Sequence, residues 1–136
     1  MFYIRALAFV VLGLLLSSAA YSQDEEAAVP GSTYVDLKPT FVVNYGGVGK
    51  LRYLKTSITL RVETGEGQTH IRRHMPYLRH KVVMLLSGAS DEDMSSMEGR
   101  ELLRQNALAA VREALVAEEG VQFVTDLLFS SFIVQS

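Results

Sequence analysis

Hydrophobic and polar residues alternate most regularly between residues 50 and 63, which predicts a strand with one buried and one solvent-facing side. The side predicted to be buried carries Leu54, Ile58, Leu60 and Val62. Residues 35–45 predict an earlier strand because they are rich in β-branched and aromatic side chains, and Pro39 predicts a kink in it. Glycines predict the reversal between the two strands, at residues 46–49, and the turn that ends the second, at residues 64–69.

The hydrophobic spacing then changes to three and four residues, which predicts two helices. The first begins near Pro76, which suits a first helical turn, and stops at Gly88. Its apolar residues are Leu78, Val82, Leu85 and Leu86. Ser95 and Glu98 have the spacing of a capping box at the start of the second helix, which ends before Gly120. The apolar stripe of this helix consists of Leu102, Leu103, Ala107, Val111 and Leu115.

The last strand is predicted to run from Val121 to Gln135. Its hydrophobic residues occupy both alternating sets of positions around Leu127, Leu128 and Phe129, which is typical of a strand covered on both faces. We therefore expect the closing sequence FSSFIVQS, residues 129–136, to complete the sheet as its middle or best protected strand. Truncation before Phe129 is then expected to unfold the domain.

The order of these elements predicts an α+β fold, because strand, strand, helix, helix and strand form a layer of helices on a small sheet. The expected sheet is antiparallel or mixed, with about three strands packed by the two helices. The folded domain is expected over residues 34–136. The preceding residues 23–33 are acidic and small and are interrupted by Pro30, so they predict a flexible linker.

The N-terminal residues 1–22 have the order of a secretory signal, with the cation Arg5, then an apolar run over residues 6–16, then small residues. Ala20 and Ser22 permit cleavage before Gln23. The alternative is a retained membrane anchor, although the apolar run is shorter than the roughly 20 residues that usually cross a bilayer. Either alternative exports the rest of the chain.

Composition argues against several classes of function. The 136 residues suit one domain and include no cysteine for a disulfide or a thiolate metal site. With 13 basic and 15 acidic residues, the chain lacks the positive charge that nucleic acid binding requires. No serine lies in a nucleophile elbow, and the glycines of residues 46–49 lack the spacing of a phosphate-binding loop. We therefore predict no catalytic residue and no cofactor, and Glu118 and Glu119 at a helix end indicate no cleft.

Three histidines are the candidates for a metal site. His70 and His74 have the spacing that places two imidazoles on one helix face, as in some zinc sites, but Pro76 disfavours a continuous helix through them. We expect solvated histidines at a passage from strand to helix. The alternative is a metal site that His80 or a carboxylate completes.

A basic cluster, Arg72, Arg73, Arg79 and Lys81, is predicted to be a solvated surface that faces the acidic residues 91–93. The alternatives are an interface for an acidic partner, for anionic lipid head groups, or for a neighbouring copy of the chain.

Several stretches together resemble the flagellar basal body-associated protein FliL family. The opening strand has Leu37, Pro39, Phe41, Val43 and Asn44, the second strand has LRYLKTSITLRV at residues 51–62, and the first helix is at residues 76–87. The second helix begins with Glu98, Gly99, Arg100, Glu101 and Leu103, and the chain ends with Phe129, Phe132, Val134 and Gln135.

This resemblance implies a periplasmic domain similar in fold to the stomatin and prohibitin (SPFH) membrane-scaffold domain. Family members assemble, in a ring-like manner, beside or around the stator units of the flagellar motor and support motility without catalysis. The basic cluster and the residues Phe129 and Phe132 thereby become candidates for partner contacts. The short N-terminal segment departs from the full transmembrane helix of typical members. The alternative function is a periplasmic envelope scaffold or ligand-binding module without a motor role.

Overall fold

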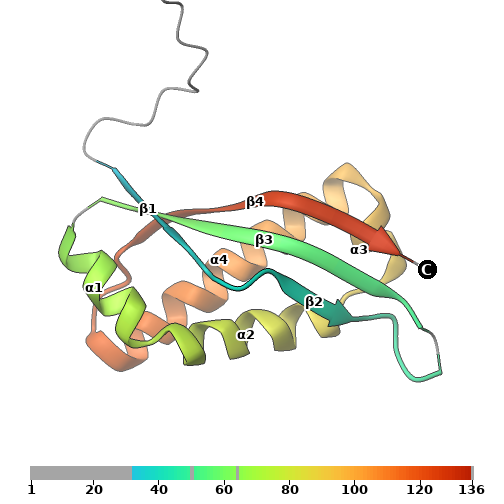
Figure 1. The fold of residues 1–136 in the computed structure, drawn as a ribbon, viewed down its shortest axis with the longest axis horizontal. Coiled ribbons are helices and arrows are strands. Elements are labelled where there is room, and N and C mark those ends of the chain that lie inside the picture. Colours follow the sequence, from blue (N-terminus) through green and yellow to red (C-terminus); the bar gives the residue numbers. More distant parts are fainter. Residues whose placement is uncertain (1–31, 50, 64, 136) are drawn as a thin grey trace, which may run out of the picture.

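The computed structural model describes residues 32–49, 51–63 and 65–135. The elements follow in the order β1 (Thr33–Asp36), β2 (Phe41–Asn44), β3 (Tyr53–Val62), α1 (Gly65–Arg73), α2 (Met75–Ser87), α3 (Asp91–Ser95), α4 (Met97–Glu119) and β4 (Val124–Gln135). Helices and sheet form two layers (Figure 1), as expected for an α+β fold. The predicted signal or anchor lies outside the described residues, as does the predicted linker up to residue 31. The last residue of that linker, Thr33, is already the first residue of β1.

The sheet is antiparallel, and β3 is its central strand. One edge of β3 pairs with β4 along its whole length, from Tyr53 opposite Gln135 to Val62 opposite Val124. The other edge pairs first with β2 and then with β1, which lie end to end. The predicted first strand over residues 35–45 is therefore two short strands, separated by a break that contains Pro39.

The alternation predicted for β3 is confirmed. Leu54, Ile58, Leu60 and Val62 are buried under the helices, whereas the odd-numbered residues from Lys55 to Arg61 lie on the opposite face of the sheet. Thr56 shares the buried face, and its hydroxyl donates to the carbonyl oxygen of Ser131 at 2.6 Å. This bond satisfies the one polar side chain among the buried residues that the structure describes.

Among the described residues, the helical layer contains four helices where the sequence predicted two. Residues 65–73, interpreted as a turn and a passage, form α1 with Gly67 in its interior. The capping box predicted at Ser95 is wrong. Ser90 and Asp93 form a capping box at α3, and the Ser96 hydroxyl accepts the Gly99 backbone N–H at the start of α4. The predicted positions of Pro76, Gly88 and Gly120 at helix ends are confirmed.

Buried residues on α2 and α4 form the core with the sheet. They are Leu78, Val82 and Leu86 on α2, and Leu103, Ala107, Val111, Ala114 and Leu115 on α4. Leu102, predicted to belong to this stripe, is exposed instead, and Leu85 is half-buried.

The prediction that β4 is the middle or best protected strand is wrong. Among the described residues, β4 pairs with β3 alone and forms an edge of the sheet. Val124 and Leu127 are buried, but the strand becomes half-buried and then exposed toward its end. Its register against β3 shifts twice, which leaves Thr125 and Ser130 as extra residues of two β-bulges.

Serine hydroxyls complete the hydrogen bonds at the second bulge. Ser131 accepts the backbone N–H of Ser57 on its Oγ at 3.1 Å, and the Ser130 hydroxyl donates to the Ser57 carbonyl at 3.2 Å. Ser130 and Ser131 therefore replace part of the regular ladder, which keeps the strand paired beyond the irregularity.

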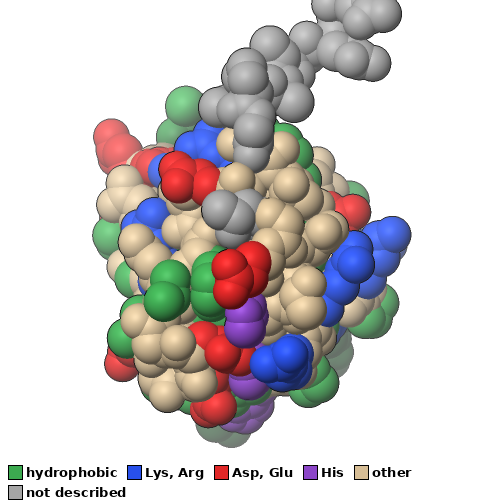
Figure 2. All heavy atoms as spheres, turned by 90° about the vertical axis from the view of Figure 1, so that its left-hand side faces the viewer, with side chains coloured by type: hydrophobic (Ala, Val, Ile, Leu, Met, Phe, Trp, Pro, Cys, Tyr) green, Lys and Arg blue, Asp and Glu red, His purple; other side chains and the backbone are tan. Residues whose placement is uncertain are grey.

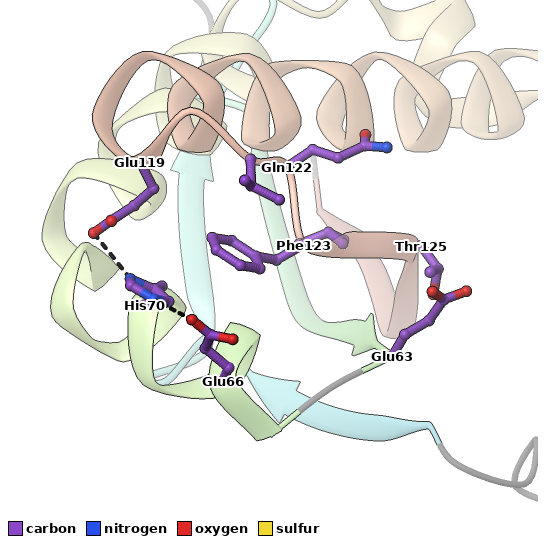
Figure 3. A pocket seen from close by; sticks show the side chains of 9 residues that line it. Glu63, Glu66, His70, Glu119, Gln122, Phe123 and Thr125 are labelled. Atoms are coloured by element: carbon purple, nitrogen blue, oxygen red, sulfur yellow. Dashed lines mark ion pairs between the residues drawn. The ribbon is translucent and has the colours of Figure 1, made fainter.

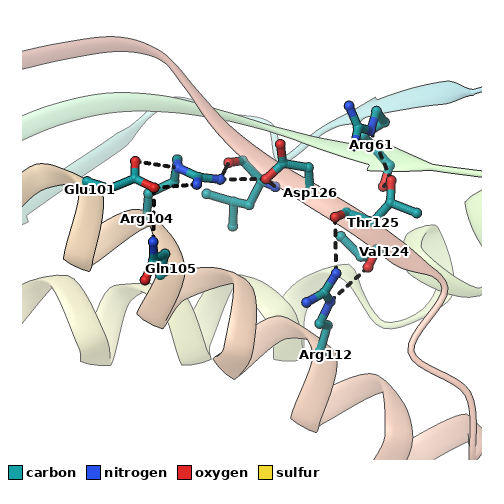
Figure 4. Close-up of polar contacts among 9 residues, drawn as sticks. Arg61, Glu101, Arg104, Gln105, Arg112, Val124, Thr125 and Asp126 are labelled. Atoms are coloured by element: carbon teal, nitrogen blue, oxygen red, sulfur yellow. Dashed lines mark hydrogen bonds and ion pairs between the residues drawn. The ribbon is translucent and has the colours of Figure 1, made fainter. Parts of the chain in front are cut away.

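Arginines of α4 anchor the first half of β4 (Figure 4). Arg112 donates to the carbonyl oxygens of Val124 and Thr125 at 2.9 and 3.0 Å. Arg104 donates to Asp126 at 2.5 Å and to the Leu127 carbonyl at 3.3 Å. These hydrogen bonds stop at Leu127, which is also the last fully buried residue of β4.

Candidate functional site

A pocket of about 600 Å³ lies where α1, the end of α4 and the start of β4 meet (Figure 3). It is lined by Glu63, Glu66, His70, Glu119, Val121, Gln122, Phe123, Val124 and Thr125. These residues come from the first and last helices, from the loop between α4 and β4, from the start of β4 and from Glu63 just after β3, so that only the folded chain assembles them.

Glu119, the last residue of α4, is the central group of this site. Its Oε1 lies 2.6 Å from His74 Nε2, 3.0 Å from His70 Nδ1 and 3.5 Å from Arg73 Nη1. The hydrogen bond from His74 and then the contact of His70 lower the pKa of Glu119. The carboxylate therefore remains ionised to lower pH than an ordinary glutamate.

His70 is held on its other sides by a carboxylate and an aromatic ring. Its Nε2 lies 3.7 Å from Glu66 Oε1, one helical turn earlier on α1. Its ring stacks on Phe123, with centroids 4.8 Å apart and planes 7° from parallel. His70 Nδ1 is buried and lies 3.0 Å from its polar neighbour Glu119 Oε1, so the two side chains form an ion pair when the imidazole is protonated.

Phe123 reaches His70 because of two local features. Its backbone φ is 54°, an uncommon left-handed value that turns the chain from α4 into β4. Gly67 on α1 leaves room for it, since a Cβ at that position would lie 3.0 Å from Phe123 Cβ and 2.5 Å from Val62 Cγ1. The second glycine of the predicted turn is therefore required for packing.

The expectation of solvated histidines is wrong for His70 and His74, which are mostly buried in contact with Glu119, and holds for His80, which is exposed on α2. The expectation that Glu119 indicates no cleft is also wrong. Within the described ranges, no three histidine or carboxylate side chains are arranged to hold a metal ion. Spacing alone had pointed to the histidines, but it gave no signal for Glu119.

The predicted basic cluster is divided by the structure. Arg72 and Arg73 are exposed on α1 and Lys81 on α2. Arg79, in contrast, donates to the carbonyl oxygens of Leu37 and Pro39. We call the exposed group Arg72, Arg73 and Lys81 the basic surface.

The acidic residues 91–93 do not face this basic surface. Asp91 forms an ion pair with Arg52, and Asp93 caps α3. The end of the molecule that carries the pocket is also charged (Figure 2), with acidic and histidine side chains in the centre of the view and lysine or arginine beside them.

The other predicted contact residues, Phe129 and Phe132, are half-buried on β4. Their rings meet edge to face with centroids 5.2 Å apart, and the Arg100 guanidinium lies 4.8 Å from the Phe132 centroid. A second hollow, of about 300 Å³, runs between α4 and this part of β4. It is lined by Met97, Arg100, Glu101, Arg104, Leu128 and Phe129.

Comparison with known proteins identifies the family. Residues 34–135 match the family described as flagellar basal body-associated protein FliL. The chain belongs to the FliL family. It is 27% identical over 117 residues to the flagellar protein FliL of Escherichia coli K12, which covers 86% of this chain and 74% of that protein. The flagellar protein FliL of Aquifex aeolicus is 26% identical over 99 residues, covering 73% of this chain and 59% of the relative.

The FliL match extends from the second residue of β1 to the end of β4, so both the pocket and the edge of β4 lie within it. The chain is thus a flagellar basal body-associated protein by family. None of the helices in residues 32–49, 51–63 and 65–135 of this FliL chain has the length and hydrophobicity to cross a membrane.

Proposed function

We propose that this chain is a non-enzymatic structural protein of the bacterial flagellar motor that associates with the basal body and the stator units and supports motility. The observation that carries this proposal is the FliL match over residues 34–135, which spans nearly all of the described fold. Relatives in Escherichia coli and Aquifex aeolicus that bear the name flagellar protein FliL support it. The domain acts in the periplasm, with residues 1–22 either retained as an anchor at the inner membrane or removed.

We further propose that the domain resembles the stomatin and prohibitin fold and assembles in a ring-like manner. The open edge of β4 supports contacts between copies. Residues 127–135 of β4 contain no charged residue, although exposed edge strands usually carry charges or proline that prevent pairing with other chains. An edge without this protection is suited to a permanent contact, and we propose that a strand of a neighbouring copy pairs with the edge of β4.

Two positions on the sheet provide a matched test of this contact. Ile133 on β4 and Val42 on β2 both pair with Lys55 of β3, from opposite edges of the sheet, and are 50% and 66% exposed. Ile133→Lys is expected to leave the purified chain folded but to reduce its oligomeric mass in light scattering. Val42→Lys is the control and should leave that mass unchanged. If Val42→Lys dissociates the oligomer and Ile133→Lys does not, the contact lies at the other edge.

We assign the basic surface to contact with the stator. Arg72 and Lys81 have no ion pair with any described residue, so both cations remain available to an acidic partner. Charge contacts of this kind favour fast and reversible association, which suits a partner that is exchanged. The double variant Arg72→Glu with Lys81→Glu should therefore reduce motility while leaving oligomer size unchanged.

The proposal as a whole is tested in cells. A deletion strain is expected to swim and swarm poorly under viscous load, and the wild-type gene should restore motility. A fluorescent fusion is expected to form foci at flagellar bases. A diffuse envelope signal together with normal motility of the deletion strain would instead support an envelope scaffold or ligand-binding module without a motor role.

A further inference from the structure

We propose that His70 and His74 form a pH-dependent latch with Glu119, which ties the junction of α1 and α2 to the end of α4 when the imidazoles are protonated. This inference concerns the pocket at the α1 end of the fold and does not depend on the flagellar role. It rests on the position of the three residues in the chain, on the charges around them, and on the ring stacked against His70.

The three residues occupy points where the chain changes direction. His74 is the single residue between α1 and α2, with φ −100° and ψ 12°, and its side chain makes no capping hydrogen bond to the α2 backbone. Glu119 ends α4 immediately before the left-handed Gly120. A contact between their side chains, at 2.6 Å, therefore joins two helix ends that are 45 residues apart in the sequence.

The net charge of the side chains around this contact becomes less negative as the pH falls. Three carboxylates line the pocket, those of Glu63, Glu66 and Glu119, and the guanidinium of Arg73 lies beside Glu119, with Nη1 3.5 Å from its Oε1. The lining residues between Val121 and Thr125 add no titratable group. Protonation of His70 and His74 adds two positive charges beside Glu66 and Glu119.

Two further contacts favour the protonated state. A carboxylate at the C-terminal end of a helix is repelled by the helix dipole, and Glu119 is in this position, so imidazolium neighbours remove an unfavourable interaction. The stacked His70 ring also gains a cation–π interaction with Phe123 once it is charged. Both effects strengthen attachment of α1 to the turn between α4 and β4.

The pH window follows from the groups that ionise. The latch is strongest while both imidazoles carry a proton, and it weakens as the pH rises and they lose it, because a neutral imidazole keeps one N–H donor but no positive charge. Its lower limit is set by protonation of Glu119, whose pKa is lowered by His74 and His70, so the carboxylate persists below the ordinary value of 4.5. Between these limits, acidification should tighten this end of the molecule.

The test uses the full chain and follows the imidazole resonances by NMR from pH 4.5 to 8. His70 and His74 are expected to titrate at higher pH in the wild type than in Glu119→Gln, while the exposed His80 is unchanged. Glu118→Gln, an exposed neighbour of Glu119, is the matched control and should leave all three titrations in place. Equal titration of His70 and His74 in the wild type and in Glu119→Gln would overturn the latch.

A second measurement decides the question if Glu119→Gln does not fold. Backbone hydrogen exchange, corrected for its intrinsic pH dependence, is expected to show several-fold greater protection of α1 at pH 5.5 than at pH 7.5. His70→Gln and His74→Gln should each abolish this gain, whereas His80→Gln should retain it. Acid-dependent protection that survives in both pocket variants would contradict the proposal.

Discussion

The guanidinium of Arg79 lies over the ring of Phe41, 4.0 Å from its centroid. From this position Nη1 donates to the carbonyl oxygens of Leu37 and Pro39 at 2.9 and 2.6 Å. Arg79 therefore fastens α2 to the segment that separates β1 from β2, where the ladder against β3 is interrupted. It supplies the hydrogen bonds that a regular strand would have received from its neighbour.

Arg79→Ala is therefore expected to lower the free energy of unfolding by about 1–3 kcal/mol, because it leaves carbonyl oxygens unpaired and removes the cation–π contact. Urea unfolding measures this loss. Lys81→Ala, two residues away on the exposed side of α2, should change stability by less than about 0.5 kcal/mol. Equal effects of the two variants would show that Arg79 belongs to the solvated surface, as the sequence had suggested.

The neighbouring residues Leu127 and Leu128 test how far the core extends along β4. Leu127 is 0% exposed and Leu128 is 39% exposed. Leu127→Ala is expected to cost about 2–5 kcal/mol because it leaves a cavity, whereas Leu128→Ala should cost less than about 1 kcal/mol. Chemical unfolding of both variants decides this, and similar losses would mean that β4 is covered on both faces.

The two bulges of β4 explain why its sequence pattern was misleading. Each bulge inserts one residue and so moves the following side chains to the other face of the sheet. As a result Val124, Leu127, Phe129 and Phe132 all pair with residues on the buried face of β3, although they belong to both alternating sets. The pattern that predicts a doubly covered strand is here produced by a strand with one covered face. β3 has no such insertion among its own residues, and its alternation predicted its buried face correctly.

The pocket could be predicted only in part, because sequence spacing reports neighbours along one element. His70 and His74 are recognisable as a pair from their spacing. Their common partner Glu119 lies 45 residues beyond His74 and joins them through the packing of α1 and α2 against the end of α4. The sequence did not predict helix α1, because glycines at positions 65 and 67 are typical of a turn. In the structure, Gly67 has a different role, since the absence of a side chain leaves room for Val62 and Phe123.

Glu101 and Arg104 on α4 are expected to make stability depend on pH in the acid range. Arg104 donates to both carboxylate oxygens of Glu101, at 2.8 and 2.5 Å, and this bond, followed by that of Gln105, lowers the pKa of Glu101 to about 2. Because the folded-state pKa lies below the ordinary value, the stabilising contribution is present above pH 4.5 and is lost as the pH falls toward 2.

The corresponding measurement is the melting temperature of the wild type and of Glu101→Gln between pH 2 and 6. The difference between them should shrink as the pH falls, and high salt should reduce it because Glu101 is half-exposed. Glu98→Gln, an exposed glutamate on the same helix without an ion pair to any described residue, is the control. A difference that stays constant from pH 6 to pH 2 would exclude the ion pair as its cause.

Gly67 is expected to be the glycine of α1 that tolerates no side chain. A Cβ there would lie 2.5 Å from Val62 Cγ1, and Val62 is fully buried, so it cannot move aside without disturbing the core. Gly67→Ala should therefore destabilise the domain by about 1–3 kcal/mol, even though alanine favours helix formation. The same Cβ approaches Phe123, so the stacked ring of His70 should also be displaced.

Gly65 provides the control on the same helix, because a Cβ at that position meets no atom within 4 Å. Gly65→Ala should leave stability unchanged or raise it by up to about 1 kcal/mol, since it restricts the unfolded chain without a clash. Denaturant unfolding gives both values, and NMR of the His70 ring protons reports whether the stack persists. A stabilising effect of Gly67→Ala with an unchanged His70 spectrum would show that α1 does not pack against Val62 and Phe123 as described.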